Sequence, residues 1–300
     1  MVGADPKFAP CREVVALDGG DVPEVRWFGP GQDDEVVRHF EWCRAVGPLV
    51  VARPDGEPSG TGRPVESLAV DSLAIVSFNM NLGAASAIEL VASLRTGAFT
   101  AGAPVTDFVL LLQETIREGN GVPDRVPKGS GTGRGVFPSP RRGPRLDIVR
   151  IADSLRLHLF YGPAMRSGKG RNPSGLSEDR GNAMLSTLPL SSLVMVELPF
   201  GGARRVAQLA RVTGRTRSGR AWSLQVNAFS LRGTAESVKI LQRAFPETLQ
   251  GDSVPTRGPQ RLDFLFFRLP GDDETRPYRT LPFDFGSDHR PVMGWVRFAD

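Results

Sequence analysis

The chain has 300 residues, of which 40% are hydrophobic and 23% are charged, a balance typical of a globular protein and unlike a disordered or fibrous one. That length suffices for one large α/β domain or two smaller ones, and no apolar run approaches the roughly 20 residues of a membrane-spanning helix. The formal net charge is only +4 although the sequence pI is about 9.5, so we expect positive charge to be clustered.

The first part of the chain is predicted to be an N-terminal extension over residues 1–70, followed by the main domain over residues 71–300. The opening residues, MVGADPKFAP, lack the basic and apolar regions of a secretory signal, so a cytoplasmic location is the default expectation. Export stays open, because a signal could have been removed from the recorded chain.

A helix is predicted over residues 33–46, because apolar residues recur there at helical spacing and acidic residues stand at its start. His39 lies inside that pattern and is interpreted as a residue of the helix face. A proline- and glycine-rich connector over residues 52–64 follows. The two cysteines have no CxxC or Cys/His zinc spacing, so one disulfide between Cys11 and Cys43, or two buried thiols, are equally consistent with the sequence.

The main domain consists mainly of predicted strands. Helices are predicted at residues 86–97, where Ser86 and Glu89 form a capping box, and at residues 146–155 and 234–245. Because several strands follow one another directly, the pattern predicts an α/β fold with sheets packed face to face and helices outside. The strands are predicted at residues 72–78, 107–112, 157–162, 182–187, 192–198, 206–212, 221–227, 261–267 and 292–298.

Two glycine-rich stretches carry clustered positive charge. Residues 117–145 contain seven Lys and Arg side chains against two acidic ones, and residues 166–180 add four more basic side chains. Cationic loops of this kind suit a phosphate-bearing partner such as a nucleic acid. Solvated loops in an arginine-rich chain explain either stretch alone equally well.

Polar residues stand where apolar strands end, and this recurs four times along the chain. Asn79 and Glu114 each follow a strand, Asp263 lies inside one, and Asp288 and His289 stand at the entrance of the last. Carboxylate and amide oxygens are hard ligands suited to Mg²⁺ or Mn²⁺, and a carboxylate beside an imidazole is a general-base arrangement. Each feature alone would be a turn or cap, but the ordered set indicates a site.

These segments resemble the endonuclease/exonuclease/phosphatase superfamily, which includes deoxyribonuclease-like nucleases, apurinic endonucleases, sphingomyelinases and inositol-phosphate phosphatases. An ordered set that includes both the strand-QE and the SDH elements is fairly specific. The resemblance implies a four-layer α/β sandwich of two packed, mainly antiparallel sheets, with the site at one edge. The matching segments are SFNMN, DFVLLLQE, DRGNAMLSTLPL, RLDFLFF and GSDHRPV, spread over roughly residues 70–300.

The resemblance also implies a role for each polar residue. Glu114 would be the principal ligand of Mg²⁺ or Mn²⁺, and Asn79 would support the metal or its water. His289 would be the general base or a phosphate-polarising group, with Asp263 holding its imidazole and Asp288 helping to place the metal or the imidazole. The reaction would be in-line attack of water on a phosphodiester or phosphomonoester.

Two further positions belong to the substrate side by the same resemblance. Asn182 lies in the segment that shapes the phosphate pocket of relatives, and Arg166 lies in YGPAMRSG, which resembles a substrate-side loop. The expected partner is a phosphate ester, with DNA, RNA, a lipid head group and a soluble phosphate left open. A monomer is the default expectation.

One departure from the family's pattern bears on activity. After the strand that ends here at Asn227, relatives carry a His-bearing strand end, a helix and a strand ending in Gly-Asp-x-Asn. In this chain Ala228 and Phe229 stand at the place of the His, and the next predicted helix follows without an Asp-x-Asn. The lost strand would leave a sheet edge exposed.

The missing Asp-x-Asn positions and activates the attacking water in relatives, so its loss is expected to lower the rate by about 10²–10⁴-fold or more. The sequence therefore predicts a metal-dependent phosphoesterase of the nuclease or phosphatase type with impaired activity. One alternative is a non-catalytic scaffold, a pseudoenzyme that binds phosphate or nucleic acid, and another is an internally truncated chain with no stable function.

Overall fold

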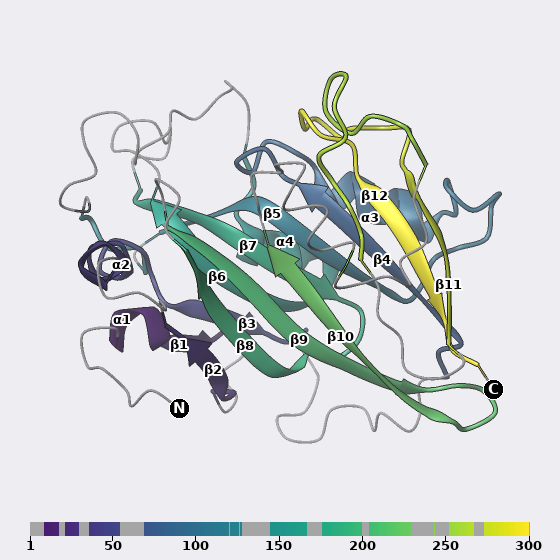
Figure 1. Ribbon diagram of the computed structural model, residues 1–300, viewed down its shortest axis with the longest axis horizontal. Helices are drawn as coiled ribbons and strands as arrows, with labels where there is room; N and C mark the ends of the chain where they lie inside the picture. Colours follow the sequence, from purple (N-terminus) through teal and green to yellow (C-terminus); the bar gives the residue numbers. More distant parts are fainter. Residues whose placement is uncertain are drawn as a thin grey trace.

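The computed structural model in Figure 1 confirms the predicted fold class, an α/β sandwich of two packed, mainly antiparallel sheets with helices outside. No helix among the described residues is both long and apolar enough to span a membrane. The structure describes residues 9–17, 22–29, 36–54, 69–119, 121–125, 127, 145–166, 176–199, 204–229, 243, 252–266 and 273–299.

The large sheet has the strand order β1-β3-β6-β7-β5-β4-β12-β11 within the described residues. Its centre contains β4 (Ser72–Asn79) and β5 (Phe108–Glu118), which run parallel so that Asn79 lies opposite Gln113. The strand β12 pairs antiparallel with β4 on the other side. The remaining strands are β1 (Val14–Ala16), β3 (Leu49–Ala52), β6 (His158–Arg166), β7 (Glu178–Ser186), β11 (Glu274–Thr280) and β12 (Val292–Arg297).

The small sheet has the order β10-β9-β8-β2, and it forms from β8 (Ser191–Leu198), β9 (Arg205–Arg215), β10 (Ala221–Phe229) and β2 (Val25–Phe28). The first three make an antiparallel meander, and β2 joins β8 in parallel. Strands from residues 1–70 therefore belong to both sheets. Among the described strands, β10 is an edge strand of this sheet.

The alternation of apolar side chains along the strands creates two cores. Leu73 and Ile75 of β4 pack toward the small sheet, where they meet residues of β8, β9 and β10. Val76 and Phe78 point to the other face, which α3 (Ala87–Arg95) and α4 (Ile148–Leu155) cover. Both faces of β4 are buried, which explains why its sequence is a nearly continuous apolar run. The strand predicted from that run at residues 72–78 is confirmed.

The predicted helix over residues 86–97 is confirmed as α3. The Ser86 hydroxyl accepts a hydrogen bond from the Glu89 amide at 3.1 Å, which satisfies one of the unpaired donors of the first turn. The helix gives way to a turn in which Gly97 has φ +73°, a left-handed conformation that glycine adopts readily. In α4, Asp147 caps the first turn in the same way, by accepting from Val149 and Arg150.

The N-terminal elements form a third cluster, at one side of the sandwich (Figure 1). The predicted helix of residues 33–46 is confirmed as α2 (Val36–Cys43), and a disulfide joins Cys43 to Cys11 of α1 (Ala9–Arg12). His39 lies on the buried face of α2 with Cys43. The structure therefore selects the disulfide from the two alternatives that the sequence left open.

The predicted strand over residues 261–267 is wrong for its described part. Residues 261–266 belong to no strand, and the backbone N–H groups of Leu262 and Asp263 donate instead to the Thr256 hydroxyl, at 2.9 and 3.2 Å. A side-chain acceptor thus replaces a sheet ladder. The predicted end of the strand at residue 112 is also wrong, because β5 continues through an irregularity to Glu118.

Two further expectations lie outside the described residues. These are the helix over residues 234–245, of which only position 243 is described, and all but the first three residues of the connector over residues 52–64.

The disulfide between Cys11 and Cys43 closes a loop of 32 residues in sequence separation, and we expect it to stabilise the fold by about 3–4 kcal/mol through restriction of the unfolded chain. Urea unfolding of the Cys11→Ser/Cys43→Ser variant should show this loss. A reductant should destabilise the wild-type protein by the same amount and leave the double variant unchanged; equal sensitivity of both proteins would contradict the expectation.

Candidate functional site

The first element of the site is a distortion of β5 at Glu114. The pairing of β5 with β7 shifts register between Leu112 and Thr115, and Glu114 within this bulge has φ +52°. A left-handed conformation costs a non-glycine residue roughly 1–2 kcal/mol. Bulges of this kind re-aim side chains beside functional sites, and here the half-buried Glu114 carboxylate is turned toward the end of β4.

Asn79, the last residue of β4, meets Glu114 directly. Its side-chain Nδ2 donates to a Glu114 carboxylate oxygen at 3.2 Å, and its side-chain oxygen, Oδ1, accepts from the Asn81 backbone N–H at 2.8 Å. Asn79 is buried, so its orientation is fixed by these two bonds. The parallel pairing of β4 with β5 therefore brings together the two residues that the resemblance assigns to the metal.

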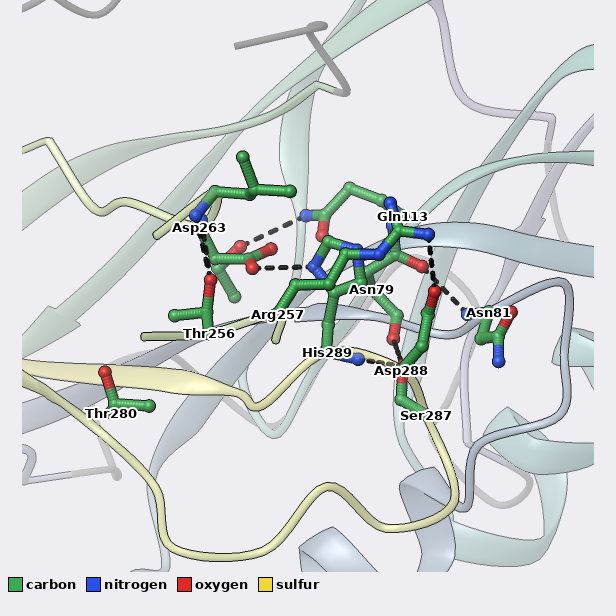
Figure 2. A network of polar contacts seen from close by, with 12 residues as sticks. Asn79, Asn81, Gln113, Thr256, Arg257, Asp263, Thr280, Ser287, Asp288 and His289 are labelled. Atoms are coloured by element: carbon green, nitrogen blue, oxygen red, sulfur yellow. Dashed lines mark hydrogen bonds and ion pairs between the residues drawn. The ribbon is translucent and has the colours of Figure 1, made fainter. Parts of the chain in front are cut away.

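The second element is a buried His–Asp pair. His289 Nδ1 lies 2.7 Å from a carboxylate oxygen of Asp263, and both residues are buried (Figure 2). The Ser287 hydroxyl accepts from the His289 backbone N–H at 3.0 Å and donates to the Asn79 carbonyl oxygen at 2.7 Å. The same serine therefore holds the backbone of His289 against the end of β4, beside Glu114.

Asp288 points to a different partner. Its carboxylate forms an ion pair with Arg257 at 2.8 Å, and both side chains are accessible to solvent (Figure 2). It therefore lies at the solvent-exposed side of His289 rather than in the buried pair. The imidazole is held by Asp263 and not by Asp288.

The two predicted substrate-side residues make other contacts. Asn182 is buried in β7 and donates to the Val206 carbonyl oxygen at 2.9 Å, which links the two sheets. Arg166, at the end of β6, is 2% exposed, with contacts at 3.2 Å to Asp124 and 3.0 Å to the Ser177 hydroxyl. Burial lowers the pKa of the Arg166 guanidinium. The structure does not bring Arg166 into contact with the residues described above.

Sequence reasoning overlooked Arg180. It lies opposite Ile116 in the pairing of β5 with β7 and is 4% exposed. Burial lowers the pKa of its guanidinium, and the nearby charge of Glu114 opposes that change. Arg180 belongs to the basic stretch of residues 166–180 and stands two positions before Asn182. This closeness to a predicted substrate-side residue was the signal in the sequence that could have identified it.

Buried ion pairs fix the same end of the large sheet. Arg117 Nε donates to Asp179 at 3.2 Å, and the Tyr161 hydroxyl donates to the same carboxylate at 2.8 Å. Burial, together with the Asp179 charge, raises the pKa of Tyr161 well above its ordinary value. Arg145 pairs with Glu178 at 2.5 Å. Such pairs are costly to break once buried, so they hold the ends of β5, β6 and β7 in place.

Backbone strain gathers at the same edge. Residues with left-handed φ are expected mainly at turns and functional sites. Besides Glu114, they occur in the loop after β4 and in the loop before Ser287: Asn81 (φ 47°), Leu82 (57°), Gly83 (76°), Phe285 (50°) and Gly286 (85°).

The donors at this edge fit a hard divalent cation. Mg²⁺ commonly takes only one or two protein carboxylates and fills its remaining positions with water and substrate phosphate, so the Glu114 carboxylate, oriented by the Asn79 side-chain N–H, could serve as its protein ligand. Among the described residues, the one group of three His, Cys, Asp or Glu ligand atoms within 4.8 Å of one another is Cys11, Cys43 and Glu197. Its cysteines form the disulfide, so it gives no support for Mg²⁺ or Mn²⁺.

No protein-family model matches the sequence, and a search of curated proteins returned no significant match. The structure is an α/β sandwich in which an amide, carboxylates and a His–Asp pair lie close together near the end of β4, a central strand of the large sheet. The function therefore has to be argued from this geometry.

The left-handed backbone of Glu114 predicts that glycine stabilises the fold more than alanine at this position, which is the reverse of their order within a helix. Glu114→Gly and Glu114→Ala remove the same carboxylate, but glycine adopts φ +52° without the strain that alanine would have. The Gly variant should therefore be more stable than the Ala variant by about 1 kcal/mol. At the exposed Glu89 of α3 the order should reverse, because glycine weakens a helix by about 0.5–1 kcal/mol relative to alanine. Urea unfolding of the four variants tests this; an alanine preference at position 114 would refute the strain.

Proposed function

We propose that the protein is a divalent-metal-dependent phosphoesterase of the endonuclease/exonuclease/phosphatase type, which hydrolyses a phosphodiester or phosphomonoester at a reduced rate. The observation that carries the proposal is the buried His289–Asp263 pair, bound through Ser287 to the end of β4, where Asn79 meets the strained Glu114. The two parts that a phosphoester site would need, a carboxylate for a cation and an imidazole as general base, therefore lie near each other at the end of β4, which supports the proposal.

Each residue has a definable part in such a reaction. Asp263 holds Nδ1 of the His289 imidazole, which leaves Nε2 as the atom that accepts a proton or donates to a phosphate oxygen. Glu114 and Asn79 would hold Mg²⁺ or Mn²⁺, which when bound neutralises charge that develops on the phosphoryl oxygens. Arg180, buried beside Glu114, offsets the charge of that carboxylate from the β7 side.

The reduced rate follows from a feature of the sequence. Ala228 and Phe229 end β10 where relatives carry a His, and no Asp-x-Asn precedes the next predicted helix. His289 is thus left without the partner that orients the attacking water in relatives. The same feature favours a second candidate function, a scaffold that binds phosphate esters without turnover.

Turnover of bis(4-nitrophenyl) phosphate at saturating Mg²⁺ or Mn²⁺ tests the proposal. We expect slow hydrolysis that a chelator removes and that Glu114→Gln abolishes, while the exposed control Glu89→Gln retains it. His289→Ala should lower kcat by about 10²-fold or more, since general-base catalysis typically contributes 10²–10⁴-fold. Wild-type protein without turnover that still binds phosphate would favour the scaffold.

The His289–Asp263 pair should act as a unit, because the carboxylate works only through the imidazole it holds. We therefore expect Asp263→Asn to lower kcat, and the double variant Asp263→Asn/His289→Ala to be no slower than His289→Ala alone. Additive losses in kcat, measured with the same substrate, would show that the two residues act separately.

A further inference from the structure

Arg257 stands on a rigid turn beside the site. The backbone N–H of Arg257 donates to the Gln260 carbonyl oxygen, and the Arg257 carbonyl oxygen accepts from the Gln260 backbone N–H, both at 2.9 Å. Gly258 supplies the left-handed φ of +51° within this turn. The closed turn fixes the point from which the Arg257 side chain extends.

Thr256 binds the turn to Asp263 and to Arg290, the residue that follows His289. The Thr256 hydroxyl accepts from the Asp263 backbone N–H at 3.2 Å, and the Thr256 carbonyl oxygen accepts from the Arg290 backbone N–H at 2.7 Å. Thr256 itself is 1% exposed. Arg257 is therefore placed relative to Asp263 and His289 by its neighbour in the chain, independently of its own side-chain contact.

The Arg257 side chain contacts Asp288, as Figure 2 shows. The guanidinium nitrogen lies 2.8 Å from the carboxylate oxygen, and the side chains of Arg257 and Asp288 are 52% and 29% exposed. An ion pair this accessible contributes only about 0–1 kcal/mol, because water and salt screen it. A more highly charged partner with suitable geometry can therefore displace Asp288 at little cost.

A phosphate group is such a partner. A guanidinium presents its N–H donors as a planar fork that matches two phosphate oxygens, and charge-assisted bonds of this kind are among the strongest that side chains form. Asp288 follows Ser287 and precedes His289, so a phosphate that binds Arg257 in place of Asp288 would lie close to the residue that carries the imidazole.

We propose that Arg257 is the phosphate-binding residue of this site and that its ion pair with Asp288 is exchanged when phosphate binds. In the absence of phosphate, Arg257 neutralises Asp288 and lowers the attraction of the site for a cation. Phosphate then binds the guanidinium and leaves the Asp288 carboxylate free to attract the cation. The inference deepens the proposed function and rests on it for the role of the cation, but the phosphate contact holds for an enzyme or a scaffold.

Two binding titrations separate this exchange from a structural role. Isothermal calorimetry would measure Mg²⁺ alone and inorganic phosphate alone, on wild-type protein and on Arg257→Ala. In Arg257→Ala we expect phosphate affinity to fall about tenfold, because the guanidinium is lost. Mg²⁺ affinity should rise severalfold, because the Asp288 carboxylate is no longer neutralised by Arg257. The opposite signs matter, since a variant damaged in its fold would lose both affinities. Thermal melting should show an unchanged Tm, as expected for an exposed side chain.

The chain offers a matched control in Arg217, which pairs with Asp71 at 3.2 Å with 83% and 38% of the two side chains exposed. Asp71 precedes β4 and so lies at the opposite end of that strand from Asn79. Arg217→Ala should change neither titration. Arg257→Lys keeps the charge but not the fork, and should give intermediate phosphate affinity.

Three outcomes would overturn the proposal: wild-type protein that binds no phosphate, phosphate affinity unchanged in Arg257→Ala, or Mg²⁺ affinity that falls together with phosphate affinity. A failure of the proposed function is distinguishable from these. It would appear as absent turnover of bis(4-nitrophenyl) phosphate in wild-type protein whose phosphate affinity still depends on Arg257.

Discussion

The hydroxyl of Ser287 makes the contact on which the rest of the site depends. It donates to the carbonyl oxygen of Asn79, 208 positions earlier in the sequence, and accepts from the backbone N–H of His289. One side chain thus joins the C-terminal loop, which carries the imidazole, to the end of the central strand, which carries the amide next to Glu114. The pairing of β12 with β4 begins only at Val292, beyond the imidazole.

The packing of the sandwich stabilises left-handed backbone conformations near the end of β4 that are individually unfavourable. Glu114 adopts a left-handed φ inside a strand, and Asn81, Leu82 and Phe285 do so in the adjoining loops. Buried ion pairs such as that between Arg117 and Asp179 restrain the strands on one side. The α3 and α4 core packs beneath them on the other. Strain of this kind persists where surrounding packing over-determines the backbone, and it is a common property of sites that hold reactive groups in place.

The sequence predicted those elements whose signals are local. The continuous apolar run of β4 and the Ser86 cap of α3 were recognised because burial on two faces and a capping hydroxyl leave a pattern in neighbouring residues. The short strands β1, β2, β3 and β11 were missed, since runs of three to seven residues carry little periodicity. The strand expected over residues 261–267 failed because an apolar run does not reveal whether a pairing strand exists.

The same division holds for the site. Asn79, Glu114, Asp263, Asp288 and His289 could be proposed from their order, because each stands at a recognisable place relative to a predicted strand. The ion pair of Asp288 with Arg257 and the two contacts of Thr256 could not, because they depend on a turn whose position is set by distant parts of the chain. The left-handed φ of Glu114 was equally invisible, since nothing in LLLQET marks a bulge.

The division of the N-terminal strands between the two sheets has a consequence for synthesis of the chain. Val25 of β2 pairs with Leu193 of β8, and Val50 of β3 pairs with Tyr161 of β6, so these pairings cannot form until more than half of the chain has been made. The pairing of β3 with β1 involves only residues that emerge early. The disulfide between Cys11 and Cys43 needs only residues that emerge early. In an oxidising environment it would give the first 50 residues a preformed loop, which holds their strands close together while their partners are still being translated.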